Sequence, residues 1–229
     1  MNIIAFDTAL DVFSIGLLIG KQGYYLELNN GLKHSELIME GMEIVLGMAG
    51  IRKTELNGIA CMEGPGSFTG LRIGFATAKG LSFALGIPLI PVPTLDCIVF
   101  PYSFWPGLVI PVIDAKKNAF FYALYQEGDR ISDYLDTSIE ELVSLVKSKN
   151  IRHSLLITGP AASMVFPAIN DYFPGTAVTI DNERGFAAEL LKLAEKTCIL
   201  KTEVSCGPMY LRKSDAELLS EHQVSGKQK

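Results

Sequence analysis

The sequence predicts an α/β protein in which one βββαβα unit occurs twice and forms two lobes. In the first hundred residues, three strand-like segments are followed by a helix, a strand, a helix and a strand. The same order begins again after a proline-rich connector from Pro101 to Pro106. The segments Ile3–Thr8 and Ile110–Ala115 also match, because both are apolar and end in Asp followed by a small residue. A length of 229 residues fits one large domain or two small lobes.

Each element of the first lobe follows from a local pattern. Apolar, β-branched or alternating runs predict strands over 2–7, 13–19, 23–28, 58–62 and 88–92. A helix is predicted over 35–49, with Ser35 as its N-cap and Gly50 as its left-handed stop. A second helix is predicted to begin at residue 69 or 70 and to end at 85, before Gly86.

The second lobe repeats these patterns. Strands are predicted over 108–113, 119–125, 130–135, 155–158 and 177–180, and helices over 139–147, 161–170 and 185–197. We therefore expect one lobe over 1–101 and another over 102–207. A C-terminal helix of about 214–220 is expected to return to the first lobe.

Composition narrows the function classes. The chain has 20 Lys and Arg against 25 Asp and Glu, a net charge of −5, and 48% hydrophobic residues, which excludes a disordered scaffold. The acidic balance argues against a stand-alone nucleic-acid binder. The four cysteines form no CxxC pair, no signal peptide precedes the first strand, and no apolar stretch reaches about 20 residues, so we expect a cytoplasmic protein without a membrane span.

Two aspartates mark candidate nucleotide-binding loops. Asp7, followed by Thr8, and Asp114 each end a strand and stand six residues before an aromatic residue that begins the next one. Such paired hairpin tips would face each other across a cleft, as in the superfold of actin, sugar kinases and heat-shock ATPases. A glycine loop around Gly159 would complete that cleft. The alternative is that both aspartates only form turns.

The densest cluster of special residues is the run from Gly64 to Gly74, GPGSFTGLRIG, between a strand and a helix. Ser67, Thr69 and the amides of the helix start could bind an anion, although the run lacks the Lys of a Walker A loop. The alternative is that the glycines allow a tight turn and close packing, with Ser67 or Thr69 as the N-cap of the helix. Capping of the helix is the role expected for Thr69, and phosphate contact stays open.

This run resembles the bacterial TsaB family, formerly YeaZ. The resemblance extends to FDTA near the start, HSEL from His34, DAKKNAFFYALY from Asp114 and Tyr210-Leu211-Arg212 near the end. It implies an actin-like fold of the ribonuclease-H-like ASKHA class. It also implies a non-catalytic role in placing threonylcarbamoyl on the adenosine beside the tRNA anticodon, with the paralogue TsaD as the transferase and obligatory partner. The ATPase TsaE would join them, and tRNA would be held only through the complex.

The residues argue against catalysis by this chain. In TsaD-type paralogues two histidines four residues apart hold a metal, whereas the matching positions here are Thr94 and Ile98, so no metal site is expected. A glycoprotease needs paired ligands and a Glu base, and a serine hydrolase needs a Gly-x-Ser-x-Gly elbow; both patterns are missing. The enzyme alternative is a nucleotide hydrolase or phosphotransferase that uses Asp7, Asp114 and the loop at Gly159. We expect that the chain requires no cofactor. Weak binding of ATP or ADP, or binding of a nucleotide at the partner interface, stays open.

Both predicted helices of the first lobe carry apolar residues on more than one face, which is typical of a binding surface or of full burial. The resemblance favours a surface, because TsaB pairs with itself or with TsaD through these helices. The expected interface residues are His34, Leu37, Ile38, Met42, Val45, Arg72, Phe75 and Lys79. A homodimer with a storage or scaffolding role is the third alternative.

Overall fold

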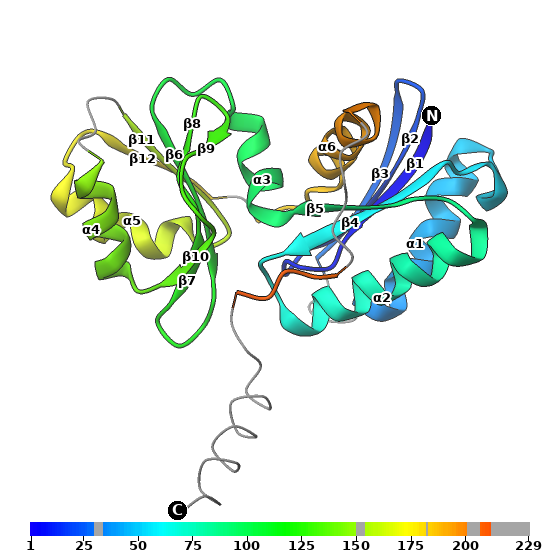
Figure 1. Ribbon diagram of the computed structural model, residues 1–229, viewed down its shortest axis with the longest axis horizontal. Coiled ribbons are helices and arrows are strands. Elements are labelled where there is room, and N and C mark those ends of the chain that lie inside the picture. Colours follow the sequence, from blue (N-terminus) through cyan, green and yellow to red (C-terminus); the bar gives the residue numbers. More distant parts are fainter. Residues whose placement is uncertain (30–33, 150–153, 182, 201–206, 212–229) are drawn as a thin grey trace, which may run out of the picture.

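The computed structural model describes residues 1–29, 34–149, 154–181, 183–200 and 207–211. Two sheets lie side by side along the long axis of the molecule, each with helices on its faces (Figure 1). The expected helix at 214–220 lies outside the described residues. No helix in the described part of the chain is long and apolar enough to cross a membrane.

The first sheet has the strand order β3-β2-β1-β4-β5. Its strands are β1 (Asn2–Asp7), β2 (Phe13–Ile19), β3 (Gln22–Leu28), β4 (Gly58–Gly64) and β5 (Leu89–Pro93). The first three are antiparallel neighbours, and β4 and β5 extend the sheet in parallel from β1. Helices α1 (His34–Ala49) and α2 (Phe68–Leu85) cover one face, close to the ranges predicted for them.

The second sheet repeats this order as β10-β7-β6-β11-β12, which confirms the duplicated actin-like fold. Its strands are β6 (Leu108–Asp114), β7 (Phe120–Tyr122), β10 (Leu135–Thr137), β11 (Leu155–Gly159) and β12 (Ala177–Asp181). The expected strand over 119–125 is divided between β7 and β8 (Tyr125–Gln126), and β8 pairs with β9 (Asp129–Arg130). Helices α4 (Ile139–Ser148) and α5 (Ala162–Tyr172) cover its outer face.

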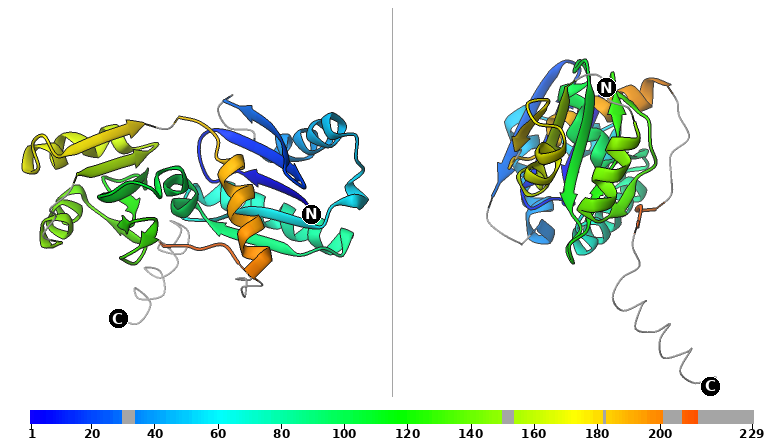
Figure 2. Two further views of the ribbon diagram at one scale, coloured as in Figure 1. Left: turned by 90° about the horizontal axis from the view of Figure 1, so that it is seen from above. Right: turned by 90° about the vertical axis from the view of Figure 1, so that its left-hand side faces the viewer.

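Helix α6 (Ala187–Leu200) packs against strands of the first sheet, on the face opposite α1 and α2 (Figures 1 and 2). The division expected from the sequence assigned this segment to the second lobe, and the contacts of α6 correct that assignment. Between β5 and β6 the chain forms a short helix, α3 (Thr94–Val99), and the 3-10 turn η2 (Phe100–Tyr102). Another 3-10 turn, η1 (Lys53–Glu55), precedes β4. We did not predict α3, because its residues read as part of an apolar connector.

Three apolar cores among the described residues hold these layers together. One fills the space between the first sheet and α1 and α2, and another lies between the second sheet and α4 and α5. The third joins the two halves, since it contains Ile3 of β1, Leu95 of α3, Val109 of β6 and Leu190 of α6. Burial of apolar surface therefore stabilises the arrangement of the two sheets as well as each sheet separately.

Candidate functional site

The glycines of the run 64–74 seat the β1–β2 loop against the start of α2. A Cβ added at Gly70 would lie 1.8 Å from the Thr8 carbonyl oxygen, and one at Gly66 would lie 2.6 Å from the Ala9 carbonyl oxygen. At Gly74 the distance to Thr8 Oγ1 would be 2.3 Å. No side chain fits at these positions, so close packing accounts for three glycines of the run.

Ser67 is the N-cap of α2, because its Oγ accepts a hydrogen bond of 3.2 Å from the Gly70 amide. The prediction that Thr69 caps this helix is wrong. The helix begins at Phe68, so Thr69 lies inside its first turn, where its side chain is exposed. A residue already within the helix cannot supply the extended backbone of an N-cap.

Asp7 and Thr8 form polar contacts within their own loop and with α2. Asp7 is fully buried, and its Oδ1 accepts a hydrogen bond of 2.8 Å from the Ala9 amide. Its Oδ2 has no partner within the described chain. Burial raises the pKa of Asp7 to about 7, and hydrogen bonding from the Ala9 and Leu10 backbone offsets this only in part. The Thr8 hydroxyl donates to the Gly70 carbonyl at 2.8 Å.

The second hairpin loop, which follows β6, holds its aspartate in a local ion pair. Asp114 is partly exposed and binds Lys116 twice, through the Lys116 amide at 2.7 Å and the Nζ at 2.8 Å. Burial would raise the pKa of Asp114, but the bonds from Lys116 lower it on balance. The hydrogen bond and charge of Asp114, together with the charge of Asp11 in the first loop, raise the pKa of Lys116. The charge of Asp11 therefore reaches Lys116 of the second loop, and the facing of the two loops across a nucleotide cleft stays a prediction.

A cavity of about 250 Å³ lies where the two halves meet near these loops. Its lining residues are Leu10, Asp11, Val12, Asn29, Pro160, Glu183 and Arg184. Gly159, expected to hold a nucleotide, directly precedes Pro160 at a φ of +103°, and a Cβ there would lie 2.6 Å from the Val112 carbonyl oxygen. The cavity brings together two carboxylates and one guanidinium, and it is smaller than the roughly 300–1,000 Å³ usual for small-molecule sites.

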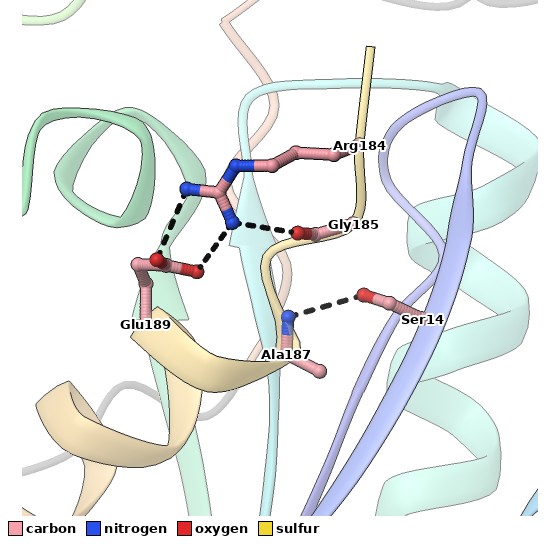
Figure 3. A network of polar contacts seen from close by, with 5 residues as sticks. All are labelled: Ser14, Arg184, Gly185, Ala187 and Glu189. Atoms are coloured by element: carbon pink, nitrogen blue, oxygen red, sulfur yellow. Dashed lines mark hydrogen bonds and ion pairs between the residues drawn. The ribbon is translucent and has the colours of Figure 1, made fainter. Parts of the chain in front are cut away.

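Arg184 belongs to a polar network that anchors the start of α6, drawn in Figure 3. Its guanidinium binds Glu189 through two contacts of 3.0 and 3.1 Å and donates to the Gly185 carbonyl at 3.1 Å. Ser14 of β2 accepts a hydrogen bond of 3.1 Å from the Ala187 amide, so a distant strand caps this helix. This network is not predicted from the sequence, because nothing local to residue 14 signals a contact with residue 187.

The helical face expected for a partner is only partly exposed. Ile38, Met42, Val45 and Phe75 are buried in the core between the first sheet and α1 and α2, which corrects their assignment to the surface. They form the stripe that faces the sheet, and helical periodicity alone cannot tell which of two apolar stripes turns inward.

The other expected interface residues stay outside that core. Arg72 and Lys79 are exposed and Leu37 is half-buried. The backbone of His34 begins α1, and its side chain lies outside the described part. The two helices instead present a set of exposed apolar side chains: Met39 (43%), Ile44 (48%), Met48 (58%) and Phe83 (90%).

Thr94 and Ile98, at the positions where the resemblance implies histidine ligands in TsaD-type paralogues, are fully buried in α3. The side chain of Ile98 offers no donor atom, so these residues do not fit a metal of that kind. Among the residues that the structure describes, no group of three or more His, Cys, Asp or Glu side chains is placed to hold a metal ion.

The chain is similar to known proteins whose names agree with one another. The family model described as "TsaD: tRNA N6-adenosine threonylcarbamoyltransferase" matches residues 31–208. The tRNA threonylcarbamoyladenosine biosynthesis protein TsaB of Bacillus subtilis is 28% identical over 231 residues, 95% of this chain and 96% of that protein. The TsaB of Buchnera aphidicola subsp. Schizaphis graminum is 36% identical over 157 residues, 67% and 72% of the two chains. A Pseudomonas aeruginosa crystal structure, described as similar to the peptidase YeaZ, superposes with a TM-score of 0.77 at 22% identity, covering 92% of this chain and 99% of that one.

Proposed function

The chain belongs to the TsaB (YeaZ) family and takes part in tRNA threonylcarbamoyladenosine biosynthesis, where we propose that it is a non-catalytic subunit that binds and activates a TsaD-type transferase. In this role it supports transfer of threonylcarbamoyl to the adenosine beside the anticodon. The tRNA is held by the assembled complex and not by this chain alone, because this chain carries a net charge of −5. The complex acts in the cytoplasm. The ATPase TsaE is the third component.

The observation that carries this proposal is the set of exposed apolar side chains on α1 and α2. Met39, Ile44 and Met48 project from α1, and Phe83 projects from α2. Full burial of a wholly exposed side chain of this kind contributes about 1.5–3 kcal/mol, and covering the partly exposed ones contributes a corresponding fraction, which favours a second protein over this surface. Methionines suit an adaptable contact surface.

The charges on this face favour a specific partner. The exposed residues of α2 include Arg72 and Lys79, seven residues apart, and those of α1 include Glu40 and Glu43. Beyond the end of α1 the face continues into a cavity of about 470 Å³ lined by Glu43, Leu46, Gly47, Ile51, Arg52, Lys53 and Thr54. A side chain of the partner can enter there. The same face can pair with a second copy of this chain, so self-association competes with binding of the transferase.

The non-catalytic part of the proposal is supported by what the candidate catalytic groups do. Thr8 donates its hydroxyl to Gly70, Asp114 is paired with Lys116, and the glycine run receives the β1–β2 loop. The nucleotide-enzyme alternative has less support, because the cavity between the halves is small and two carboxylates line it. We propose that the chain requires no nucleotide of its own.

The test is light-scattering chromatography of the chain alone and with the TsaD paralogue of the same organism, followed by a tRNA modification assay. A complex that modifies tRNA only when both chains are present is the expected result. Met48→Asp and Phe83→Asp are each expected to weaken that complex at least roughly tenfold, because they place a charge in a desolvated contact.

The matched control is Met164→Asp, which changes an exposed methionine of α5 in the other half and should leave partner binding unchanged. Equal binding by Met48→Asp, Phe83→Asp and wild type would contradict the assigned face. Turnover of ATP by the purified chain, abolished by Asp7→Asn, would contradict the non-catalytic role.

A further inference from the structure

The last described residues, Gly207–Leu211, form a strap across the beginning of the glycine run. The Met209 amide donates a hydrogen bond of 2.7 Å to the Glu63 carbonyl at the end of β4. Gly64 has a φ of +116°, and a Cβ there would lie 2.6 Å from the Met209 carbonyl oxygen. Figure 1 shows this segment passing beside the start of α2. The strap therefore lies on the glycine run, as does the β1–β2 loop.

Next in the strap, Tyr210 joins Phe68 and Arg72 in one cluster. The Phe68 and Tyr210 rings lie 5.0 Å apart between centroids, and the Arg72 guanidinium lies 3.9 Å from the Phe68 centroid and 5.8 Å from that of Tyr210. The Arg72 Nε also donates a long hydrogen bond of 3.4 Å to the Tyr210 hydroxyl. Phe68 and Arg72 are four residues apart on α2, so they share one side of the helix.

This cluster restricts an otherwise flexible side chain. A free arginine loses up to about 2 kcal/mol of conformational entropy when it is ordered, and stacking on an aromatic ring removes part of that cost before any partner arrives. The cluster uses Nε and leaves the two terminal nitrogens, which are the donors suited to a carboxylate. In the described part of the chain no carboxylate lies within ion-pair distance of Arg72.

We propose that Tyr210 is a positioning residue that holds Arg72 against Phe68 and presents its guanidinium to a carboxylate of the partner subunit. The inference rests on the proposed function, because Arg72 lies at the end of the α2 face assigned to that partner. A carboxylate suits the site better than a nucleic-acid phosphate, since the exposed acids Glu40 and Glu43 on α1 would repel a polyanion laid across the same face.

The test is a double-mutant cycle on partner affinity, measured by titration calorimetry at two salt concentrations. Arg72→Ala is expected to weaken binding roughly tenfold, and Tyr210→Ala by roughly fivefold. The double variant should bind like Arg72→Ala alone, because Tyr210 acts through Arg72. Each single variant should also reduce the salt dependence of the affinity.

The matched control is Tyr172→Ala. Tyr172 is 56% exposed and Tyr210 is 42% exposed, and Lys147 lies 3.3 Å from the Tyr172 ring centroid, so the control removes a similar cation–aromatic pair from the other half. It should leave affinity unchanged. Additive losses from Arg72→Ala and Tyr210→Ala, or wild-type affinity of Tyr210→Ala, would overturn the inference.

A second measurement does not depend on the partner. In the free chain, the Nε–Hε proton of Arg72 should give a ring-shifted nuclear magnetic resonance signal that moves to its random-coil position in Tyr210→Ala. A random-coil signal in the wild type would overturn the inference even if the partner binds. Failure of the wild type to bind the transferase, with this signal still ring-shifted, would contradict the proposed function and limit the role of Tyr210 to ordering Arg72.

Discussion

Among single residues, the main feature is Asp7, a buried carboxyl group whose pKa is raised. Asp7 occupies the position expected for a nucleotide-binding aspartate, but it is fully buried and its pKa is raised to about 7. The folded chain therefore retains a proton that the unfolded chain, with an ordinary pKa of 3.8, releases at lower pH. Stability should fall as pH rises from about 4 to 7, by on the order of 4 kcal/mol from this group.

The corresponding prediction concerns Asp7→Asn. Asparagine keeps an oxygen to accept from the Ala9 amide and carries no charge, so the fall in stability between pH 4 and 7 should largely disappear. Urea unfolding of wild type and variant at pH 5 and pH 8 measures this. Asp129→Asn, at an exposed position of β9, is the control. An equal fall in the Asp7→Asn variant would show that other groups cause the pH dependence.

At the scale of elements, α2 connects several parts of the first half. Its N-cap, its close contact with the β1–β2 loop and its cluster with the strap all lie between Gly66, just before the helix, and Gly74 in its second turn. Its exposed side carries the proposed partner contacts. The glycine run thus contacts both the β1–β2 loop, which packs the first lobe, and the strap, which holds Arg72 at the proposed interface. Neither contact involves a bound phosphate.

We predict that two alanine substitutions in α2 will have opposite effects. At Gly70 the new Cβ would meet the Thr8 carbonyl oxygen, so Gly70→Ala should destabilise the protein by roughly 3 kcal/mol or prevent folding. At Gly80 no atom lies within 4 Å of such a Cβ, so Gly80→Ala should stabilise by up to about 1 kcal/mol. Ser67→Ala, which removes the cap, should cost about 1 kcal/mol. Chemical denaturation checks all three, and equal stability of the two glycine variants would disprove close packing at Gly70.

At the scale of the whole molecule, a polar cluster supports the core shared by the two halves. Asp96 of α3 accepts hydrogen bonds from the hydroxyls of Tyr125 and Tyr134 in the second half, the latter at 2.9 Å. Burial raises the pKa of both tyrosines, and the charge of Asp96 raises them further. The two hydroxyls therefore stay protonated and donate to the carboxylate over the physiological pH range.

This arrangement predicts that the two halves unfold together. Tyr134→Phe removes one of the two donors to Asp96 and should lower stability by about 1–2 kcal/mol while a single unfolding transition remains. Tyr172→Phe, at an exposed tyrosine, is the control. Two separate calorimetric transitions in the wild type would contradict coupling through the shared core.

Local patterns in the sequence predicted the order of most elements and the duplication, because hydrophobic periodicity, caps and glycine stops are local signals. It also singled out the glycine run and the family, since GPGSFTGLRIG is a contiguous motif. Short elements escaped it: α3 was hidden in an apolar stretch, and the strand expected over 119–125 was divided.

Tertiary structure decided which stripe of α1 and α2 turns inward, and so replaced Met42 and Val45 with Met48 and Phe83 as candidate contacts. It also decided that α6 returns to the first sheet, capped by Ser14, and that Tyr210 reaches Arg72. The contacts of Ser14 with α6 and of Tyr210 with Arg72 join residues more than a hundred positions apart. Such contacts depend on how complete elements pack, and this packing leaves no local pattern in the chain.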